Sequence, residues 1–160
     1  MKEMPMETEL NVHLKSLAFR YEKKEFIVGD PSWFMHQIEG DANKELLAFI
    51  ASALSYGSRK QFLPKIQALL DSIVNDAGGD ACKWLTGHVY ETAVPPAPEC
   101  FYRLYTCQTF NTFLNALAEM VREYGTIRNY VVAYADSKQK ATDTLTAIDA
   151  ITTWFREHGS

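Results

Sequence analysis

The most informative stretch of this sequence is Glu45-Leu-Leu-Ala-Phe-Ile-Ala-Ser-Ala-Leu-Ser55, which is apolar on nearly every side. Asp41 is a good N-cap residue, Glu45 places a negative charge in the first turn, and Gly57 can end the helix. A helix that is apolar all round is buried, so we expect this helix, from Asp41 to about Tyr56, to be surrounded by others. The small residues that would let neighbouring helices approach closely are Ala48, Ala51, Ser52 and Ala53.

On both sides of this stretch, apolar residues recur at helical spacing and predict further helices. These expected helices span residues 7–21, 59–75, a short segment after Asp80, 109–124, 127–134 and 137–158. Pro64 falls late for a first-turn proline, so the helix at 59–75 either starts nearer Leu63 or is kinked. The segments 26–36 and 91–99 are expected to be loops because glycine and proline interrupt them. No run alternates apolar and polar residues long enough to make a strand convincing. The prediction is an all-α, single-domain helical bundle of about six to eight helices over residues 1–160.

Composition supports an ordinary globular domain and limits its partners. The chain has 160 residues, of which 47% are hydrophobic and 22% charged, which is typical of a folded domain rather than a disordered segment. The formal net charge is -4. A general electrostatic attraction to nucleic acid or to an anionic membrane is therefore not expected, and any such contact must be local.

The cysteines indicate a cytoplasmic protein. Cys82, Cys100 and Cys107 are odd in number and lack C-x-x-C spacing, so reduced thiols are expected. The four histidines are scattered, so we expect no metal site, and nothing in the sequence indicates a cofactor. The N-terminus lacks the apolar region of a signal peptide, and no apolar run approaches the ~20 residues that span a bilayer, so no membrane association is expected.

A search for reaction chemistry assigns no catalytic residue. The sequence has no phosphate-binding glycine-rich loop, no H-E-x-x-H, no G-x-S-x-G and no EF-hand pattern. A triad of Ser55, His36 and Asp30 has no spacing to support it. Asp41 and Glu45 share a helix face, but acids in a first turn are more simply explained by the helix dipole.

The junction Leu54-Ser-Tyr-Gly-Ser-Arg-Lys-Gln61 is the part of the chain that indicates binding. The free backbone N–H groups at the start of the second helix, together with Arg59 and Lys60, could hold a phosphate. Tyr56 could stack on a base. In the alternative interpretation, Gly57 only ends a helix, Tyr56 packs inward and the two cations are solvated. The residues alone leave both interpretations open.

That junction also carries a resemblance to a known family. The chain resembles domain-of-unknown-function family 2400, a bacterial family of unestablished activity. The residues that carry the resemblance are Phe26-Ile27, Asp30-Pro31, Phe49 to Lys60, Phe101-Tyr-Arg-Leu-Tyr105 and Phe113 to Met120. The similar region covers roughly residues 14–130, and its most specific part is Ser55-Tyr-Gly-Ser-Arg-Lys60. The resemblance implies an α-helical protein.

The family in turn looks like the helix-hairpin-helix DNA glycosylases, in which a turn after a helix pushes a side chain into the DNA beside a flipped base. By this more distant analogy Tyr56 stands where the intercalating residue does, and DNA is the implied partner. The residues implied to contact nucleic acid are His36, Tyr56, Gly57, Ser58, Arg59 and Lys60.

Two departures restrict the resemblance to the N-terminal part of the family. Members carry a Pro-His-Arg run where this chain has Met35-His36-Gln37, so one cation is missing. Members also continue into a basic helical segment and an Asp-Thr-His-Val stretch, whereas this chain stops at Ser160. We therefore expect a DNA-binding protein that lacks the glycosylase catalytic segment.

The alternative function is a non-catalytic protein-interaction or structural helical module. The surface that would meet the absent C-terminal half is then either an apolar patch that favours self-association or a surface covered by a final helix ending in Trp154-Phe155.

Overall fold

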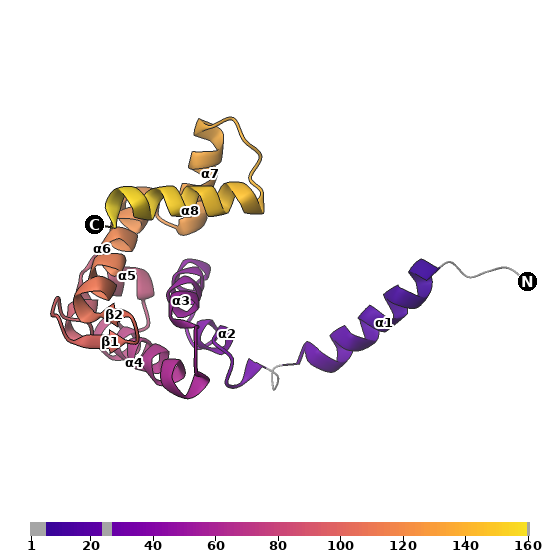
Figure 1. The fold of residues 1–160 in the computed structure, drawn as a ribbon, viewed down its shortest axis with the longest axis horizontal. Helices are drawn as coiled ribbons and strands as arrows, with labels where there is room; N and C mark the ends of the chain where they lie inside the picture. The colour runs from indigo at the N-terminus through magenta and orange to yellow at the C-terminus, as the bar shows by residue number, and fades with distance from the viewer. Residues whose placement is uncertain (1–5, 24–26, 160) are drawn as a thin grey trace, which may run out of the picture.

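The computed structural model describes residues 6–23 and 27–159. Within these residues the chain forms eight α-helices and one two-stranded hairpin, which confirms the predicted all-α bundle (Figure 1). The elements are α1 (Met6–Tyr21), α2 (Ser32–Met35), α3 (Asp41–Leu54), α4 (Arg59–Ala77), α5 (Ala81–Thr86), the 3₁₀ helix η2 (Val89–Thr92), β1 (Cys100–Tyr102), β2 (Tyr105–Thr106), α6 (Cys107–Tyr124), α7 (Ile127–Ser137) and α8 (Thr144–His158).

Helix α3 is buried against its neighbours, as its apolar sequence predicted. It packs against α2, α4 and α5. Its buried residues are Leu46, Leu47, Ile50, Ala51 and Leu54. The expected bounds need correction: Gly40, not Asp41, is the N-cap, and the helix ends at Leu54 rather than Tyr56. Ser52 is exposed, so one face of α3 stays open to solvent.

The segment 101–105 forms a hairpin that the sequence did not predict. Strands β1 and β2 pair antiparallel, with Tyr102 opposite Tyr105 and Arg103-Leu104 as the connecting tip. Phe101 and Tyr102 are buried, and Phe101 stacks on Phe110 of α6 at 4.7 Å between ring centroids. Aromatic residues suit a half-buried strand, but a run this short shows no alternation to read.

Two segments expected to be loops hold short helices. Ser32–Met35 is helical, with Phe34 buried in the core, and Val89–Thr92 forms a 3₁₀ turn ahead of the prolines. Helix α4 begins at Arg59, the earlier of the two starts that the sequence allowed, and Pro64 lies within it. Asp80 caps α5 by accepting a hydrogen bond from the Lys83 N–H, as its position predicted.

The sequence predicted two helices in the C-terminal segment, over residues 127–134 and 137–158, and the structure confirms both but places the break between them later. Helix α7 ends at Ser137, and α8 starts at Thr144 after Asp143 accepts a hydrogen bond from the Thr146 N–H. Trp154 is buried and donates from Nε1 to the Ala116 carbonyl at 2.8 Å. Helix α8 therefore covers part of the core.

Two residues that the spacing placed on the apolar stripe of α8 lie outside the core. Leu145 is 77% exposed and Ile148 is 58% exposed. The partly buried ring of Phe155 stacks on Phe113 of α6 at 5.1 Å between centroids. The inward face of α8 is therefore centred on Ala150, Trp154 and Phe155, whereas Leu145 and Ile148 near the start of the helix extend into solvent.

Helix α1 confirms the predicted helix but not the expected burial of its stripe. It lies apart from the other helices in Figure 1, and Leu10 and Leu14 are 57% and 52% exposed. Phe26, the first residue of the expected loop at residues 26–36, lies outside the described residues. Over the part of the chain that the structure describes, none of the helices combines the length and apolar character needed to cross a bilayer.

Candidate nucleic-acid interface

The turn between α3 and α4 is short and depends on one glycine. Ser55 and Tyr56 close it through hydrogen bonds from their N–H groups to the carbonyls of Ser52 and Leu54. Gly57 then takes a φ of +84°, a conformation that side chains disfavour. Ser58 is extended and starts α4 as its N-cap. The turn thus directs the first residues of α4 towards solvent.

Tyr56 packs inward rather than extending from the turn. Its ring contacts those of Tyr102 and Tyr105 edge to face, at 5.2 and 5.8 Å between centroids. Its hydroxyl is buried and lacks a hydrogen-bond partner among the described residues. Its carbonyl oxygen accepts a hydrogen bond from the Tyr102 hydroxyl. In this arrangement the partly buried Tyr56 ring fastens the turn to the hairpin.

Arg59 and Lys60 are exposed in the first turn of α4. The Arg59 side chain is 68% exposed and lies 3.7 Å from Asp30 Oδ2, a loose contact that contributes little in solvent. The Ser32 backbone N–H and hydroxyl both donate to Asp30, at 3.0 and 2.7 Å, and lower the pKa of its carboxyl. Asp30 is therefore a fixed negative neighbour that competes for Arg59.

The start of α4 keeps its first N–H groups without a side-chain cap. Ser58 occupies the N-cap position, yet its hydroxyl makes no cap hydrogen bond. The first turn of any helix presents unpaired N–H groups and the positive end of the helix dipole. At 19 residues, α4 is long enough for that dipole to be fully developed. An anion can therefore be bound by these groups.

Arg103 brings a third cation to the same place from the hairpin tip. A Cβ atom added to Gly57 would lie 2.6 Å from Arg103 Cζ, so the guanidinium covers the glycine. Arg103 Nη2 also donates to Gln61 Oε1 at 3.3 Å. The residues Gly57, Ser58, Arg59, Lys60 and Arg103 together form what we call the α4 N-terminal surface. Sequence reasoning missed Arg103, because nothing local places it beside a residue 46 positions earlier.

His36 is exposed at the end of α2. Within the described residues, no hydrogen bond, ion pair or ring contact joins it to residues 56–60. Five of the six residues implied by the resemblance are consecutive in the turn, but Tyr56 faces the hairpin and His36 lies separately. The surface that remains is cationic rather than aromatic.

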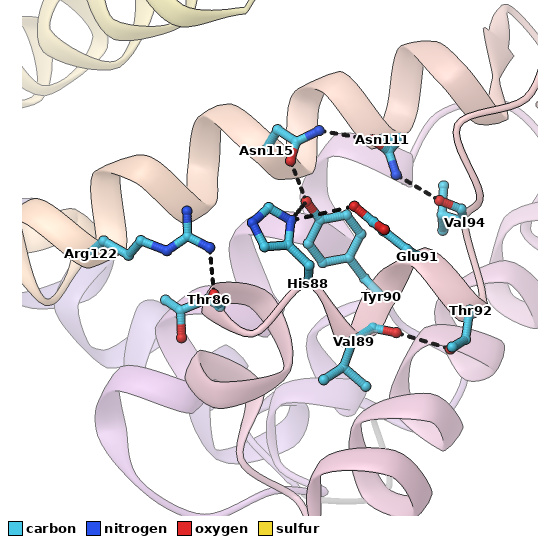
Figure 2. Close-up of polar contacts among 10 residues, drawn as sticks. All are labelled: Thr86, His88, Val89, Tyr90, Glu91, Thr92, Val94, Asn111, Asn115 and Arg122. Carbon is cyan, nitrogen blue, oxygen red and sulfur yellow. Dashed lines mark hydrogen bonds and ion pairs between the residues drawn. The ribbon is translucent and has the colours of Figure 1, made fainter.

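A second polar cluster lies between η2 and α6 (Figure 2). The Asn111 side chain donates from Nδ2 to the Val94 carbonyl at 2.8 Å. Asn115 Nδ2 donates to Asn111 Oδ1 at 2.8 Å, and Asn115 Oδ1 accepts from the Tyr90 hydroxyl at 2.6 Å. The single Tyr90 proton is thus used, so the 2.8 Å contact with His88 requires His88 Nδ1–H to donate.

The hydrogen bonds that link His88, Tyr90, Asn115 and Asn111 have a structural role. Tyr90 is fully buried, and burial raises the pKa of its hydroxyl to about 12, so it stays protonated. His88 has a φ of +55°, and Glu91 Oε1 lies 3.5 Å from its Nδ1. These contacts hold η2 and the proline segment against α6. Among the described residues, no three histidine, cysteine or acidic side chains gather as a metal site would need.

Comparison with curated proteins and with solved structures gives no significant match. The family model described as "Protein of unknown function (DUF2400)" matches residues 30–160. The match therefore begins after α1, includes the whole α4 N-terminal surface and reaches through α8, beyond residue 130 where the resemblance was expected to end. This confirms the resemblance read from the sequence: the chain belongs to the DUF2400 family.

Proposed function

We propose that this protein binds DNA by contacting its sugar–phosphate backbone at the α4 N-terminal surface. One observation carries the proposal: Arg59, Lys60 and Arg103, from two separate elements, meet at a helix start whose N-cap side chain makes no hydrogen bond. Helix N-termini and arginine side chains are the groups that hold phosphates in nucleic-acid complexes. The proposal includes no catalytic step.

The charge of the protein sets the expected character of the binding. The net charge is -4, so the surface acts locally and the rest of the protein repels DNA. Three cations neutralise about three phosphates at most, which gives a logarithmic salt slope of roughly -2 to -3. Binding should therefore be weak and sensitive to salt. In this proposal Tyr56 supports the surface from within instead of stacking on a base.

The test is a fluorescence-anisotropy titration of labelled double- and single-stranded DNA at low and moderate salt. The variant Arg59→Ala/Lys60→Ala should lose most of the binding. The matched control Arg128→Ala/Arg156→Ala removes two exposed arginines on α7 and α8 and the same charge, and should bind as the wild type does. Asp30→Asn, which releases Arg59 from its ion pair, should bind more tightly.

Two outcomes contradict the proposal. One is an absence of binding at low salt, where backbone electrostatics are strongest. The other is an equal loss in both double variants, since that result would indicate a response to net charge and not to this surface.

A second candidate function, a helical interaction module, is favoured by the exposed apolar side chains of α1. Leu10, Leu14 and Phe19 are 57%, 52% and 80% exposed. Light scattering over a concentration series would detect self-association, and Leu14→Ser/Phe19→Ser should abolish it if α1 mediates it. A cytoplasmic location is part of both proposals and is supported by the free cysteines Cys82, Cys100 and Cys107.

A further inference from the structure

Leu104, at the tip of the hairpin, is the most exposed large apolar side chain among the described residues, at 88%. Single exposed leucines are common and need no explanation on their own. This one differs in its setting, because it follows Arg103 directly and so lies beside the α4 N-terminal surface. An exposed apolar side chain thus lies next to three cations.

The hairpin tip is held firmly in place. The Tyr102 hydroxyl donates to the Tyr56 carbonyl, and Arg103 bonds to Gln61 of α4. On the other strand, the Tyr105 ring packs against Tyr56 at 5.8 Å between centroids. Both strands are thus fastened to the α3–α4 turn. The backbone that carries Leu104 therefore loses little further freedom on binding, which favours the use of this residue as a contact.

The backbone at the tip is also strained. Arg103 has a φ of +50°, which is uncommon for a residue other than glycine, asparagine or aspartate. Strain of this kind persists where surrounding contacts enforce it, and it is frequent at binding sites. Here the strained conformation places the arginine over Gly57 and leaves the leucine as the outermost side chain.

We propose that Leu104 enters the minor groove of duplex DNA as a wedge between two base pairs. This inference rests on the proposed function and deepens it. Proteins that bend DNA from the minor groove insert leucine, isoleucine, methionine or phenylalanine between base steps while neighbouring cations hold the flanking phosphates. Leu104 follows Arg103, whose guanidinium lies over Gly57, and the exposed cations Arg59 and Lys60 follow Gly57 at the start of α4.

The wedge gives the binding a preference that phosphate contacts lack. Separating two stacked base pairs is easiest at pyrimidine–purine steps and at mismatches. Duplexes with a central TA step or a mismatch should therefore bind more tightly than a duplex with an A-tract. The expected difference is several-fold, and it should disappear when Leu104 is shortened to alanine.

The experiment uses a duplex with 2-aminopurine beside a central mismatch, because its fluorescence rises when the base is unstacked. The wild-type protein should raise the fluorescence, and Leu104→Met should do so too. Leu104→Ala should remove the rise while binding the backbone within several-fold of the wild type. The control Leu145→Ala removes another exposed leucine, on α8, and should behave as the wild type.

The outcomes separate this inference from the proposed function. Binding without a fluorescence rise in the wild type, or a rise that persists in Leu104→Ala, overturns the wedge and leaves backbone binding intact. No binding of any duplex at low salt overturns both. Binding of the wild type to anionic vesicles that Leu104→Ala loses, with unchanged DNA behaviour, also overturns the wedge and assigns the tip to a lipid surface.

Discussion

Gly57 is the residue at which the α3–α4 turn and the hairpin tip meet. Its φ of +84° disfavours any side chain, and Arg103 occupies the space that a Cβ would need. The sequence analysis identified Gly57 as a helix stop, which is a local role. The contact with Arg103 is a tertiary contact, and neither the sequence of the α3–α4 turn nor that of the hairpin predicts it.

Replacing Gly57 with alanine should therefore have two separable effects. The left-handed backbone should cost about 1–2 kcal/mol in the free energy of unfolding, measured by urea denaturation. The displaced guanidinium should in addition weaken DNA binding. Gly79→Ala is a matched control, since Gly79 has a φ of +85° and nothing within 4 Å of the added Cβ. Equal DNA binding by the two variants would show that the position of Arg103 does not matter.

Tyr90 is the central hydroxyl of the polar cluster between η2 and α6. Tyr90→Phe would leave Asn115 Oδ1 without its donor and His88 Nδ1–H with only the 3.5 Å contact to Glu91, so unfolding should become easier by about 1–3 kcal/mol. Tyr134→Phe serves as the control, because its bond to Asp149 is exposed and should contribute at most ~1 kcal/mol. Thermal and urea unfolding of both variants measure the difference; equal losses would mean that the buried cluster contributes no more than a surface contact.

At the scale of elements, Glu45 joins two helices that are far apart in the sequence. Its Oε2 accepts from the Ile127 N–H at 3.1 Å, and its Oε1 accepts from the Arg128 N–H at 3.0 Å. The carboxylate of α3 thus caps α7. From the sequence Glu45 was interpreted only as a first-turn acid of its own helix, because the partner lies about 80 residues away.

Glu45→Ala should destabilise the protein by about 1–2 kcal/mol, since it removes the charged acceptor from two N–H groups at a helix start. Asp41→Ala, which removes an exposed first-turn acid from the same helix, should cost only ~0.5 kcal/mol. Amide hydrogen exchange at Ile127 and Arg128 reports the site directly. Unchanged protection there in Glu45→Ala would refute the capping role.

Asp143 at the start of α8 makes stability depend on pH. The Asp143 carboxyl accepts a hydrogen bond from the Thr146 backbone N–H, and this bond lowers the pKa of the carboxyl. A carboxyl with a lowered folded-state pKa stabilises the fold above its ordinary pKa of about 3.9, and that stabilisation is lost as the pH falls through the folded value. The free energy of unfolding between about pH 3 and pH 5 should fall less steeply in Asp143→Asn than in the wild type. Parallel curves would contradict the prediction.

Capping residues and glycines in the sequence predicted those helix ends that depend on neighbouring residues alone. The start of α4, the Asp80 cap of α5 and the end of α6 at Gly125 all follow from capping residues and glycine. The break at residues 138–143 contains neither glycine nor proline, and Gln139 takes a φ of +53° there. Asp143 caps the start of α8, and Trp154 packs onto α6 through its bond to the Ala116 carbonyl. The spacing of apolar residues contains neither of these contacts, so it placed the break between the two helices too early.

At the scale of the whole molecule, the candidate site combines features that the sequence predicted with tertiary contacts that it could not predict. The exposure of Arg59 and Lys60 follows from their place at the start of α4. The inward packing of Tyr56 depends on Tyr102 and Tyr105, and the third cation depends on the hairpin tip. The exposure of the two cations was thus predictable, while the packing of Tyr56 against the hairpin was not.

Helix α1 should contribute little to the stability of the rest. It lies outside the family match, and its apolar side chains are exposed. Removing residues 1–23 should shift Tm by no more than about 2 °C, measured by calorimetry. Removing residues 143–160 should instead abolish cooperative unfolding, because Trp154 and the cover over α6 are lost. A large drop in Tm on removing α1 would show that it packs against the body in solution.

The hydrogen bond from Tyr102 to Tyr56 closes a stretch of 46 residues, and this has a consequence for the order of folding. Helices α3, α4 and α5 lie within or beside that stretch and pack against one another. The hairpin can dock only after they are in place, because long-range loop closure is costly until local structure has shortened the loop. During refolding, helical content should therefore recover before the cationic surface is complete, so the chain would pass through a stage that has its secondary structure but lacks the surface proposed to contact DNA.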